Sequence, residues 1–413
     1  MTKAKPFQIS KVEIWESYQT VKSNKGAAGV DNQSIEDFEK DLSGNLYKIW
    51  NRMSSGCYFP SPVLRVEIPK EDGSLRPLGI PTVSDRIAQT VAKRVLEPEL
   101  ERVFHPSSFG YRPKRSTIQA VGEARKNCWR YDWVLDLDIK GFFDNIDHEL
   151  MMKAVRKHTT SKWVILYIER WLKTPVLMPD GSLQSGTKGT PQGGVISPLL
   201  ANLFLHYAFD QWIETNCSHI PFERYADDAV CHCKSEKQAK WLKESLEKRM
   251  AECRLELHPM KTKIVYCRDA DRKDRYINEA FDFLGFTFRQ RMSKNRWGKL
   301  FMNFSPAVSN KALKRIRQTI REWKLHLRSD KSLEDLAQMY NSNIRGWITY
   351  YGKFYKSMLY PTFRHLDIIL SRWSMRKFKT LKNHKRRARH WIERIAQKET
   401  KLFAHWGLLY GKC

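Results

Sequence analysis

Two adjacent acidic residues form the sharpest chemical signal in the sequence. Asp227 and Asp228 follow Arg224, Tyr225 and Ala226, and the run lies between apolar stretches. Neighbouring carboxylates repel each other, which costs stability unless cations lie between them. Asp also favours turns for local reasons, so the pair alone does not establish a functional site.

A second source of carboxylates lies earlier in the chain. Asp136 and Asp138 interrupt the apolar run 133–139, and alternation along a strand places both on one face. Burying an unpaired acid is unfavourable, so Asp138 calls for a partner. A strand acid beside a turn that carries two acids can hold two divalent ions about 4 Å apart, the arrangement used for in-line displacement at phosphorus.

The elements that must position these acids follow from local patterns. Asp72-Gly73 predicts a hairpin after the alternating residues 64–68. Residues 221–233 read as two strands around the Asp-Asp turn, with Ser197 as the N-cap of an earlier helix over 198–216. Further helices are expected over 147–158, 163–173 and 235–254, with Asp147 capping the first. The last part should be helical, with an apolar stripe at Leu313, Ile316, Ile320, Trp323 and Leu327.

Charge and composition limit the function classes. The 413 residues are 41% hydrophobic, which excludes wholesale disorder, and 73 Lys and Arg against 45 Asp and Glu give a net charge of +28. Residues 291–413 hold 29 of these bases and 7 acids, a net of +22, which predicts a domain boundary near 290–308. Such an excess favours a polyanion, with nucleic acid ahead of a membrane surface.

Other compositional signals are weaker. No run of 18 apolar residues occurs, and the N-terminus lacks the apolar core of a signal peptide, so a cytosolic protein is expected. The eight cysteines include no Cys-x-x-Cys pair, which favours reduced, buried thiols over a zinc site.

Taken in order, the motifs resemble those of bacterial group II intron-encoded reverse transcriptases with a maturase domain. The resemblance covers almost the whole chain and rests on these segments: 29–31, 68–81, 85–89, 109–116, 138–143, 189–194, 225–228, 261–263, 283–285 and 343–351. Each motif is weak or moderate alone, but their joint order makes chance negligible.

The resemblance implies an α+β fold: a right-hand polymerase with fingers and a palm built on a ferredoxin-like antiparallel sheet, plus an α-helical thumb. The expected domains are a reverse transcriptase domain over 1–290, a helical thumb or maturase domain over 291–390, and a short basic tail over 391–413. The sequence contains no Cys-rich endonuclease pattern, and in this respect it resembles the short, class C type of these proteins.

The resemblance also assigns roles at the reaction centre. Asp138, Asp227 and Asp228, with Ile139, would bind two Mg²⁺ ions, for which Mn²⁺ could substitute. Lys261 would act near the leaving pyrophosphate, although Lys263 competes for that role.

The incoming dNTP would contact four residues. Lys70 and Arg76 flank the Asp72-Gly73 turn, Phe143 matches a steric gate beneath the sugar, and Gln192 lies in a glycine-flanked loop. The simple alternatives are solvated hairpin charges, a core phenylalanine and an ordinary Gly-Pro turn.

Template and RNA contacts are expected in two places. Arg112 and Arg115 would hold the template backbone, with a structural ion pair as the alternative. In the basic C-terminal part, cations and aromatics that alternate are typical of an RNA surface, although the aromatics could equally belong to the core. The candidates there are Lys311, Lys314, Arg317, Arg321, Arg345 and Trp347.

The expected function is that of an RNA-directed DNA polymerase that extends a primer 3′-hydroxyl and binds intron RNA as a maturase for splicing and retrohoming. Its partners would be RNA template, intron RNA, DNA primer or target and dNTPs, with no membrane, in the bacterial cytoplasm and as a monomer or weak dimer. Two alternatives stay open: a non-catalytic RNA-binding splicing cofactor, and a reverse transcriptase of a retron or defence lineage.

Overall fold

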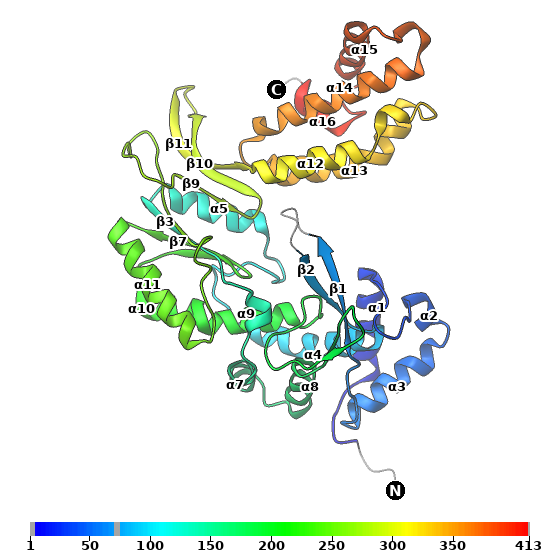
Figure 1. The fold of residues 1–413 in the computed structure, drawn as a ribbon, viewed down its shortest axis with the longest axis vertical. Helices are drawn as coiled ribbons and strands as arrows, with labels where there is room; N and C mark the ends of the chain where they lie inside the picture. Colours follow the sequence, from blue (N-terminus) through cyan, green and yellow to red (C-terminus); the bar gives the residue numbers. More distant parts are fainter. Residues whose placement is uncertain (1–4, 70–74, 412–413) are drawn as a thin grey trace. The chain divides into compact units, whose positions relative to one another are not determined.

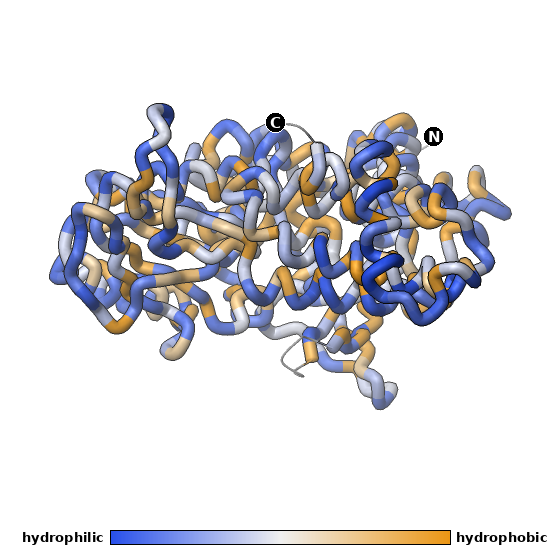
Figure 2. The backbone as a smooth tube through the Cα atoms, turned by 90° about the horizontal axis from the view of Figure 1, so that it is seen from above, coloured by the Kyte–Doolittle hydropathy of each residue, from blue (hydrophilic) through white to orange (hydrophobic). Residues whose placement is uncertain are grey.

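The computed structural model describes residues 5–69 and 75–411, and the chain divides into two compact units. The first unit comprises residues 1–116, 135–231 and 237–263, and the second comprises 117–134, 232–236 and 264–413. The chain contains both helices and sheets, and its last part is helical (Figure 1), which confirms the α+β class. In Figure 2 hydrophilic and hydrophobic stretches alternate along the backbone, as amphipathic elements require.

The first unit begins with helices that pack against one another. These helices are α1 (Lys11–Asn24), α2 (Ile35–Glu39), α3 (Leu42–Ser54) and α4 (Val83–Glu101). Ser10 and Ser34 form capping boxes that fix where α1 and α2 begin. Between α3 and α4, β1 (Val63–Pro69) and β2 (Leu75–Ile80) form the antiparallel hairpin that the sequence predicted, although its turn lies outside the described residues.

The hairpin belongs to a four-stranded sheet. Its order is β2-β1-β4-β5, with β4 (Val176–Leu177) parallel to β1 and β5 (Leu183–Gln184) antiparallel to β4.

A second four-stranded sheet, in the order β6-β7-β3-β8, carries the predicted acids. Its strands are β3 (Trp133–Leu137), β6 (Phe222–Tyr225), β7 (Asp228–Cys233) and β8 (Lys263–Tyr266). Strand β3 ends one residue before Asp138, so this acid follows the strand instead of lying inside it.

The predicted helices of this region form with small shifts. They are α6 (Phe142–Asn145), α7 (His148–His158), α8 (Lys162–Leu172), α9 (Ser197–Leu205) and α11 (Glu236–Glu252). Asp147 caps α7 as expected, since its carboxylate accepts from Leu150 N at 2.9 Å. The Ser197 prediction was wrong: Ser197 is the first residue of α9, and its hydroxyl bonds with Thr190 Oγ1 at 2.8 Å. The expected helix 198–216 contains a π-helical turn, His206–Asp210, before α10 (Gln211–Cys217).

The second unit contains a three-stranded sheet in the order β11-β10-β9, next to α5 (Thr117–Cys128). β10 (Phe286–Lys294) and β11 (Leu300–Val308) form a long antiparallel hairpin, and β9 (Ala280–Phe283) pairs only with residues 286–289 of β10. The domain boundary expected at residue 290 lies within β10.

The rest of the second unit is helical around its own core. The helices are α12 (Asn310–Glu322), α13 (Leu333–Tyr351), α14 (Tyr360–Lys377), α15 (Lys385–Lys398) and α16 (Ala404–Leu409). Leu313, Ile316 and Ile320 are buried as predicted, but Leu327 is exposed and Leu325 takes its place. The cause is that α12 ends at Glu322 and Lys324 adopts a left-handed conformation, which breaks the helical spacing.

The expected basic tail over 391–413 is part of this core. Asp367 of α14 accepts hydrogen bonds from His405, Trp406 and Tyr410, at 2.9, 2.8 and 2.9 Å. Trp406 is fully buried, so α16 is fastened to α14 by one carboxylate. No described helix is both long and apolar enough to cross a bilayer.

Candidate active site

The hairpin between β6 and β7 presents the two adjacent acids. Tyr225 pairs with Asp228 across the hairpin, so Ala226 and Asp227 form its turn. Ala226 has a φ of +57°, a left-handed conformation that a side chain other than glycine rarely adopts without support. The turn therefore needs neighbours that hold it in place.

Arg224 supplies much of that support from inside the protein. Its side chain is 1% exposed and forms a two-pronged ion pair with Asp210, with Nε–Oδ1 at 2.7 Å and Nη2–Oδ2 at 2.6 Å. Its Nη1 donates to the Ala226 carbonyl at 2.9 Å and to Asn202 Oδ1 at 3.0 Å. Arg224 therefore ties the acid-bearing turn to the π-helical turn that ends at Asp210.

Gly110 lies against the same turn. A Cβ at Gly110 would come within 2.3 Å of Ala226 N, so only glycine allows this approach. Asn202 Nδ2 donates to the Gly110 carbonyl at 2.6 Å, and Phe109 N donates to the Arg224 carbonyl at 2.8 Å. The segment before the predicted template-binding arginines thus serves as a wall of the acidic turn.

Asp138 is held by the segment that precedes β8. Its carbonyl accepts from His258 N at 2.7 Å, and Ile139 forms a β-bridge with Leu257. Its carboxylate forms an ion pair with Lys261 Nζ at 2.9 Å. The structure therefore brings the predicted Lys261 to the acids, whereas Lys263 begins β8 with an exposed side chain.

The acids influence one another electrostatically. The pKa of Asp228 rises to about 6, first because of desolvation and then because of the charges of Asp227 and Asp138, with Lys261 acting in the opposite direction. The pKa of Asp227 is also raised, by desolvation and then by Asp138. These carboxylates raise each other's pKa because too little positive charge lies near them. A bound divalent cation would supply that charge.

The carboxylates of Asp138, Asp227 and Asp228 have the chemistry of metal ligands, but they do not form a complete binding site for an ion. Carboxylate oxygens are the ligands that Mg²⁺ prefers. However, within residues 5–69 and 75–411 no three His, Cys, Asp or Glu side chains lie close enough together to hold an ion. Lys261 neutralises part of the charge on Asp138 instead.

The Gln192 loop joins two predicted dNTP contacts. Arg76 of β2 donates from Nε to Gln192 Oε1 at 3.1 Å, and Gly79 N donates to the Gln192 carbonyl at 2.7 Å. Gly193 has a φ of +123°, and a Cβ there would come within 2.3 Å of the Gly79 carbonyl. The loop is therefore fastened to β2 by backbone contact, while Lys70 lies outside the described residues.

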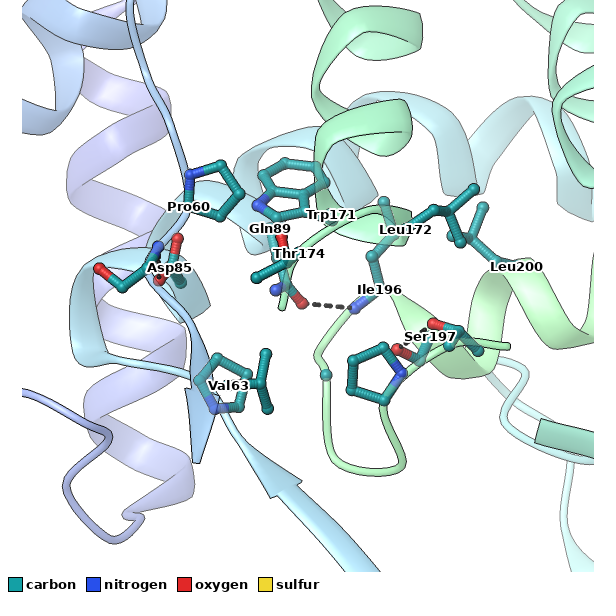
Figure 3. A pocket seen from close by; sticks show the side chains of 15 residues that line it. Pro60, Val63, Asp85, Gln89, Trp171, Leu172, Thr174, Ile196, Ser197 and Leu200 are labelled. Atoms are coloured by element: carbon teal, nitrogen blue, oxygen red, sulfur yellow. Dashed lines mark hydrogen bonds between the residues drawn. The ribbon is translucent and has the colours of Figure 1, made fainter. Parts of the chain in front are cut away.

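A small cavity behind this loop shows how α4 supports it (Figure 3). Gln89 Oε1 accepts from Ile196 N at 3.3 Å, just beyond the glycines. One turn earlier, Asp85 accepts from Tyr58 Oη at 2.6 Å and Thr82 Oγ1 at 2.8 Å. Burial raises the pKa of Asp85. Gln89 and Asp85 belong to a motif that the sequence analysis recognised without assigning a role.

Phe143 lies on the short helix α6 after Asp138, with only 8% of its surface exposed. Its carbonyl accepts from Thr190 N at 2.8 Å, which places it beside the segment that leads to Gln192. Its ring packs against Phe142 with centroids 5.5 Å apart. The position is compatible with either a steric gate or a core residue.

Comparisons with known proteins decide the family. The model for reverse transcriptase (RNA-dependent DNA polymerase) matches residues 68–288, more than half of the chain. The chain belongs to the reverse transcriptase family. The group II intron maturase-specific domain matches residues 313–391 of this reverse transcriptase, which confirms the maturase type that the motifs resembled.

Individual relatives agree with this assignment. Protein YkfC of Escherichia coli is 34% identical over 256 residues, or 60% of this chain and 63% of YkfC. Group II intron-encoded protein LtrA of Lactococcus lactis is 36% identical over 193 residues, or 46% of this chain and 32% of LtrA. A putative COX1/OXI3 intron 1 protein of Saccharomyces cerevisiae is 26% identical over 271 residues, or 65% of this chain and 32% of that protein. The chain thus spans from 32% to 63% of the length of these relatives.

The structure places the two arginines predicted to hold the template in different environments. Arg112 is buried and pairs with Glu101, with Nε and Nη2 within 3.1 Å, and its Nη1 donates to the carbonyls of His105 and Ser108 at 2.7 Å. Its donors are committed to the protein, so the template-binding prediction for Arg112 was wrong and the ion-pair alternative holds. Arg115 is exposed, with its guanidinium 5.6 Å from the Phe109 ring centroid.

The basic face of α12 forms as predicted, with one aromatic exception farther along. Lys311, Lys314 and Arg321 are exposed, and Arg317 donates from Nε to Thr362 Oγ1 at 3.3 Å. On α13, Arg345 is exposed. Trp347 stacks on Trp323 with ring centroids 5.5 Å apart and packs, partly buried, against the helical core, which favours the core alternative, while its contact with RNA stays a prediction.

Arg224 is the positioning residue that the sequence analysis missed. The available signal was a cation in the strand predicted just before the Asp-Asp turn, because a buried guanidinium requires a partner. The partner, Asp210, could not be found from spacing alone, since a π-helical turn determines its direction.

Proposed function

We propose that this protein is an RNA-directed DNA polymerase that extends a primer 3′-hydroxyl with dNTPs. The observation that carries the proposal is the Ala226–Asp227 turn, which is held by Arg224 and electrostatically coupled to Asp138, inside the region matched by the reverse transcriptase family. Because the chain covers only part of its relatives, its activity, substrates and partners are all part of this proposal.

Asp138, Asp227 and Asp228, with Ile139, would hold two divalent ions, Mg²⁺ first and Mn²⁺ as a substitute. When bound, such ions lower the pKa of the primer hydroxyl and stabilise negative charge on the attacked phosphate. The chain itself supplies a rigid turn that keeps two carboxylates side by side. Lys261, released from Asp138, would stand ready to donate a proton to the leaving pyrophosphate.

The dNTP would lie near the Arg76–Gln192 pair. The guanidinium of Arg76 is exposed and suits a triphosphate, and Gln192 offers an amide to a base or sugar. Phe143 would exclude a 2′-hydroxyl, and Lys70 would add charge from the β1–β2 turn. Arg115 remains the fingers candidate for the template backbone.

RNA binding would lie on the basic face of α12 with Arg345, within the part matched by the maturase-specific domain. On this proposal residues 1–290 form the fingers and ferredoxin-like palm, 291–390 form the thumb, and 391–413 close it. The natural RNA would be a group II intron that the protein helps to splice and move, in the bacterial cytoplasm. The protein would act there as a monomer or weak dimer.

Primer extension on an RNA template tests the proposal. Wild type should add dNTPs in Mg²⁺, whereas Asp227→Ala should lose nearly all synthesis and keep its RNA affinity. The matched control is Asp180→Ala, an exposed acid in the turn between β4 and β5. Absence of synthesis by wild type in both Mg²⁺ and Mn²⁺, or full extension by Asp227→Ala, would reject the proposal.

A further inference from the structure

We infer that the turn between β10 and β11 is a stacking site for unpaired bases of single-stranded nucleic acid. The turn covers residues 295–299, with Trp297 at its centre and Arg296 and Lys299 beside it. It lies between the two family matches, which end at residue 288 and begin at residue 313. The inference rests on the proposed nucleic-acid substrate but not on synthesis.

Trp297 is unusually exposed for its size. Its exposed fraction is 74%, the highest among the described tryptophans, the next being Trp241 at 48%. Met292 and Leu300, at the same end of the hairpin, are 52% and 60% exposed. Large apolar side chains that gather on a surface mark a site of interaction.

The turn that carries Trp297 is well ordered by its own hydrogen bonds. Asn295 Oδ1 accepts from Trp297 N at 3.0 Å and from Lys299 N at 2.9 Å, and Asn295 N donates to the Lys299 carbonyl at 3.0 Å. Gly298 has a φ of +85°, which closes the turn. A ligand that stacks on this indole would therefore find it already in place, with little loss of conformational entropy.

The hairpin itself provides a stable support. β10 and β11 pair along their whole length, from Phe286–Val308 to Lys294–Leu300, although β9 covers only the first part of β10. Tyr355 Oη donates to the Met292 carbonyl at 2.7 Å, close to the end of the hairpin. The two yellow strands can be followed past β9 in Figure 1.

The charge around the indole favours phosphate. The Arg296 guanidinium lies 4.0 Å from the Trp297 ring centroid, a cation–π contact. Residues 283–321 contain ten Lys and Arg and no Asp or Glu. Within the described ranges, no acid forms an ion pair with Lys294, Arg296 or Lys299. A bound phosphate chain would relieve the mutual repulsion of these cations.

Single-stranded nucleic acid fits this surface better than the other partners. Every base has a π-face that can stack on an aromatic ring, but a duplex covers those faces. A second copy of the chain would bring the same dense positive charge to the contact. An anionic lipid surface shares the phosphate chemistry but offers no planar group to Trp297.

Binding measurements with matched variants test the inference. The probes are a single-stranded RNA of mixed sequence and a duplex of the same length, compared by fluorescence anisotropy at several salt concentrations. Trp297→Ala should weaken single-strand binding by roughly tenfold, with an unchanged salt slope and little change for the duplex. Trp297→Phe should retain most of the affinity, and Trp241→Ala on α11 should behave as wild type.

Substitution of the cations should change the salt dependence of binding, which substitution of Trp297 leaves unchanged. Replacing Arg296 and Lys299 by Gln should lower the salt slope by roughly 1.4, because each phosphate contact with a single strand contributes about 0.7. Together, the two variant sets separate stacking from charge.

Equal single-strand affinity for wild type and Trp297→Ala would overturn the inference. So would an effect of Trp297→Ala confined to binding of anionic vesicles or to self-association in sedimentation. Primer extension measured in parallel keeps the two proposals apart. If wild type fails to synthesise but Trp297→Ala still loses RNA affinity, the polymerase proposal fails and the stacking site stands.

Discussion

Charged residues serve the acidic turn and the basic face of α12 in opposite ways. At the turn, Arg224 is buried and its donors are committed to Asp210, Asn202 and the Ala226 carbonyl. On α12, Lys311, Lys314 and Arg321 are exposed above an apolar stripe that carries the packing. The buried charge therefore fixes the geometry of the turn, whereas the charges on α12 lie at the protein surface.

Arg112 and Arg115 repeat the same contrast within three residues of sequence. Arg112 is buried in a structural ion pair with Glu101, and Arg115 is exposed. Residue type and local motif are the same for both, so burial is what separates an arginine committed to the protein from one that is predicted to bind the template.

The largest effect is expected from removing the buried charge of Arg224. Arg224→Ala leaves Asp210, which is fully buried, without its partner, and removing one member of a buried pair costs about 3–5 kcal/mol. Denaturant unfolding should show a loss of this size, against less than about 0.5 kcal/mol for Arg115→Ala.

Arg224→Lys provides the functional version of this test. It keeps the charge but not the planar fork, so synthesis should fall much more than RNA affinity, with a raised Mg²⁺ requirement. If Arg224→Lys has the synthesis rate and Mg²⁺ requirement of wild type, the positioning role is refuted.

The next largest effect is expected from removing the exposed charges of α12. Replacing Lys311, Lys314, Arg317 and Arg321 by Gln should lower RNA affinity and reduce the salt slope by up to roughly 2.8, if each contacts a single-strand phosphate. Folding should survive, because exposed charges add little stability.

A matched control removes the same number of cations from α11 by replacing Lys237, Lys240, Lys243 and Lys248 with Gln. An equal loss from both variants would show that RNA binding follows net charge alone. An unchanged salt slope of RNA affinity for the α12 variant would show that this face contacts solvent and not RNA.

A smaller effect sharpens the role of Phe143. Phe143→Val removes ring volume, so incorporation of ribonucleotides relative to deoxyribonucleotides should rise severalfold if the ring excludes the 2′-hydroxyl. Phe142→Val is the matched control, since Phe142 is the buried neighbour in the same helix. A core role for Phe143 predicts that both variants lose stability and that neither changes the ratio.

The smallest effect is a gain in stability from removing Asp228, a predicted metal ligand. The raised pKa of Asp228, about 6, means that its ionised form destabilises the folded state above that pH. Although desolvation raises the pKa of Asp228, water still reaches part of this residue, so the gain from Asp228→Asn in EDTA should be modest, about 1–3 °C in Tm at pH 7.5.

The pH dependence has a definite sign. The gain should be full above pH 6 and shrink as the pH falls toward 4, where the wild-type carboxyl is protonated in both states. Mg²⁺ should abolish the gain by stabilising wild type. A gain that is independent of pH and Mg²⁺ would contradict the electrostatic explanation.

Local patterns were enough to predict most of the elements around the acidic turn. The alternation before Asp72-Gly73 identified the β1–β2 hairpin, and the Asp-Asp turn between apolar runs identified β6 and β7. Acids that lie within apolar sequence are informative because burial makes them costly without partners.

The misses arose where distant contacts or a local break decided the outcome. Leu325 replaced Leu327 in the core because α12 ends early, and the β10–β11 hairpin was read as a boundary. The partners of Arg112 and Arg224 lie 11 and 14 residues away, beyond the reach of helical or strand periodicity.

Single-turnover nucleotide addition tests the central claim most directly. The measurement uses saturating protein on a primed RNA template and compares wild type, Asp227→Ala and the α12 quadruple variant in Mg²⁺. If the acidic turn performs the chemistry and α12 only holds RNA, Asp227→Ala should lose at least about a thousandfold in rate, while the quadruple variant keeps the wild-type rate once bound. A quadruple variant as slow as Asp227→Ala, or an Asp227→Ala as fast as wild type, would contradict the account.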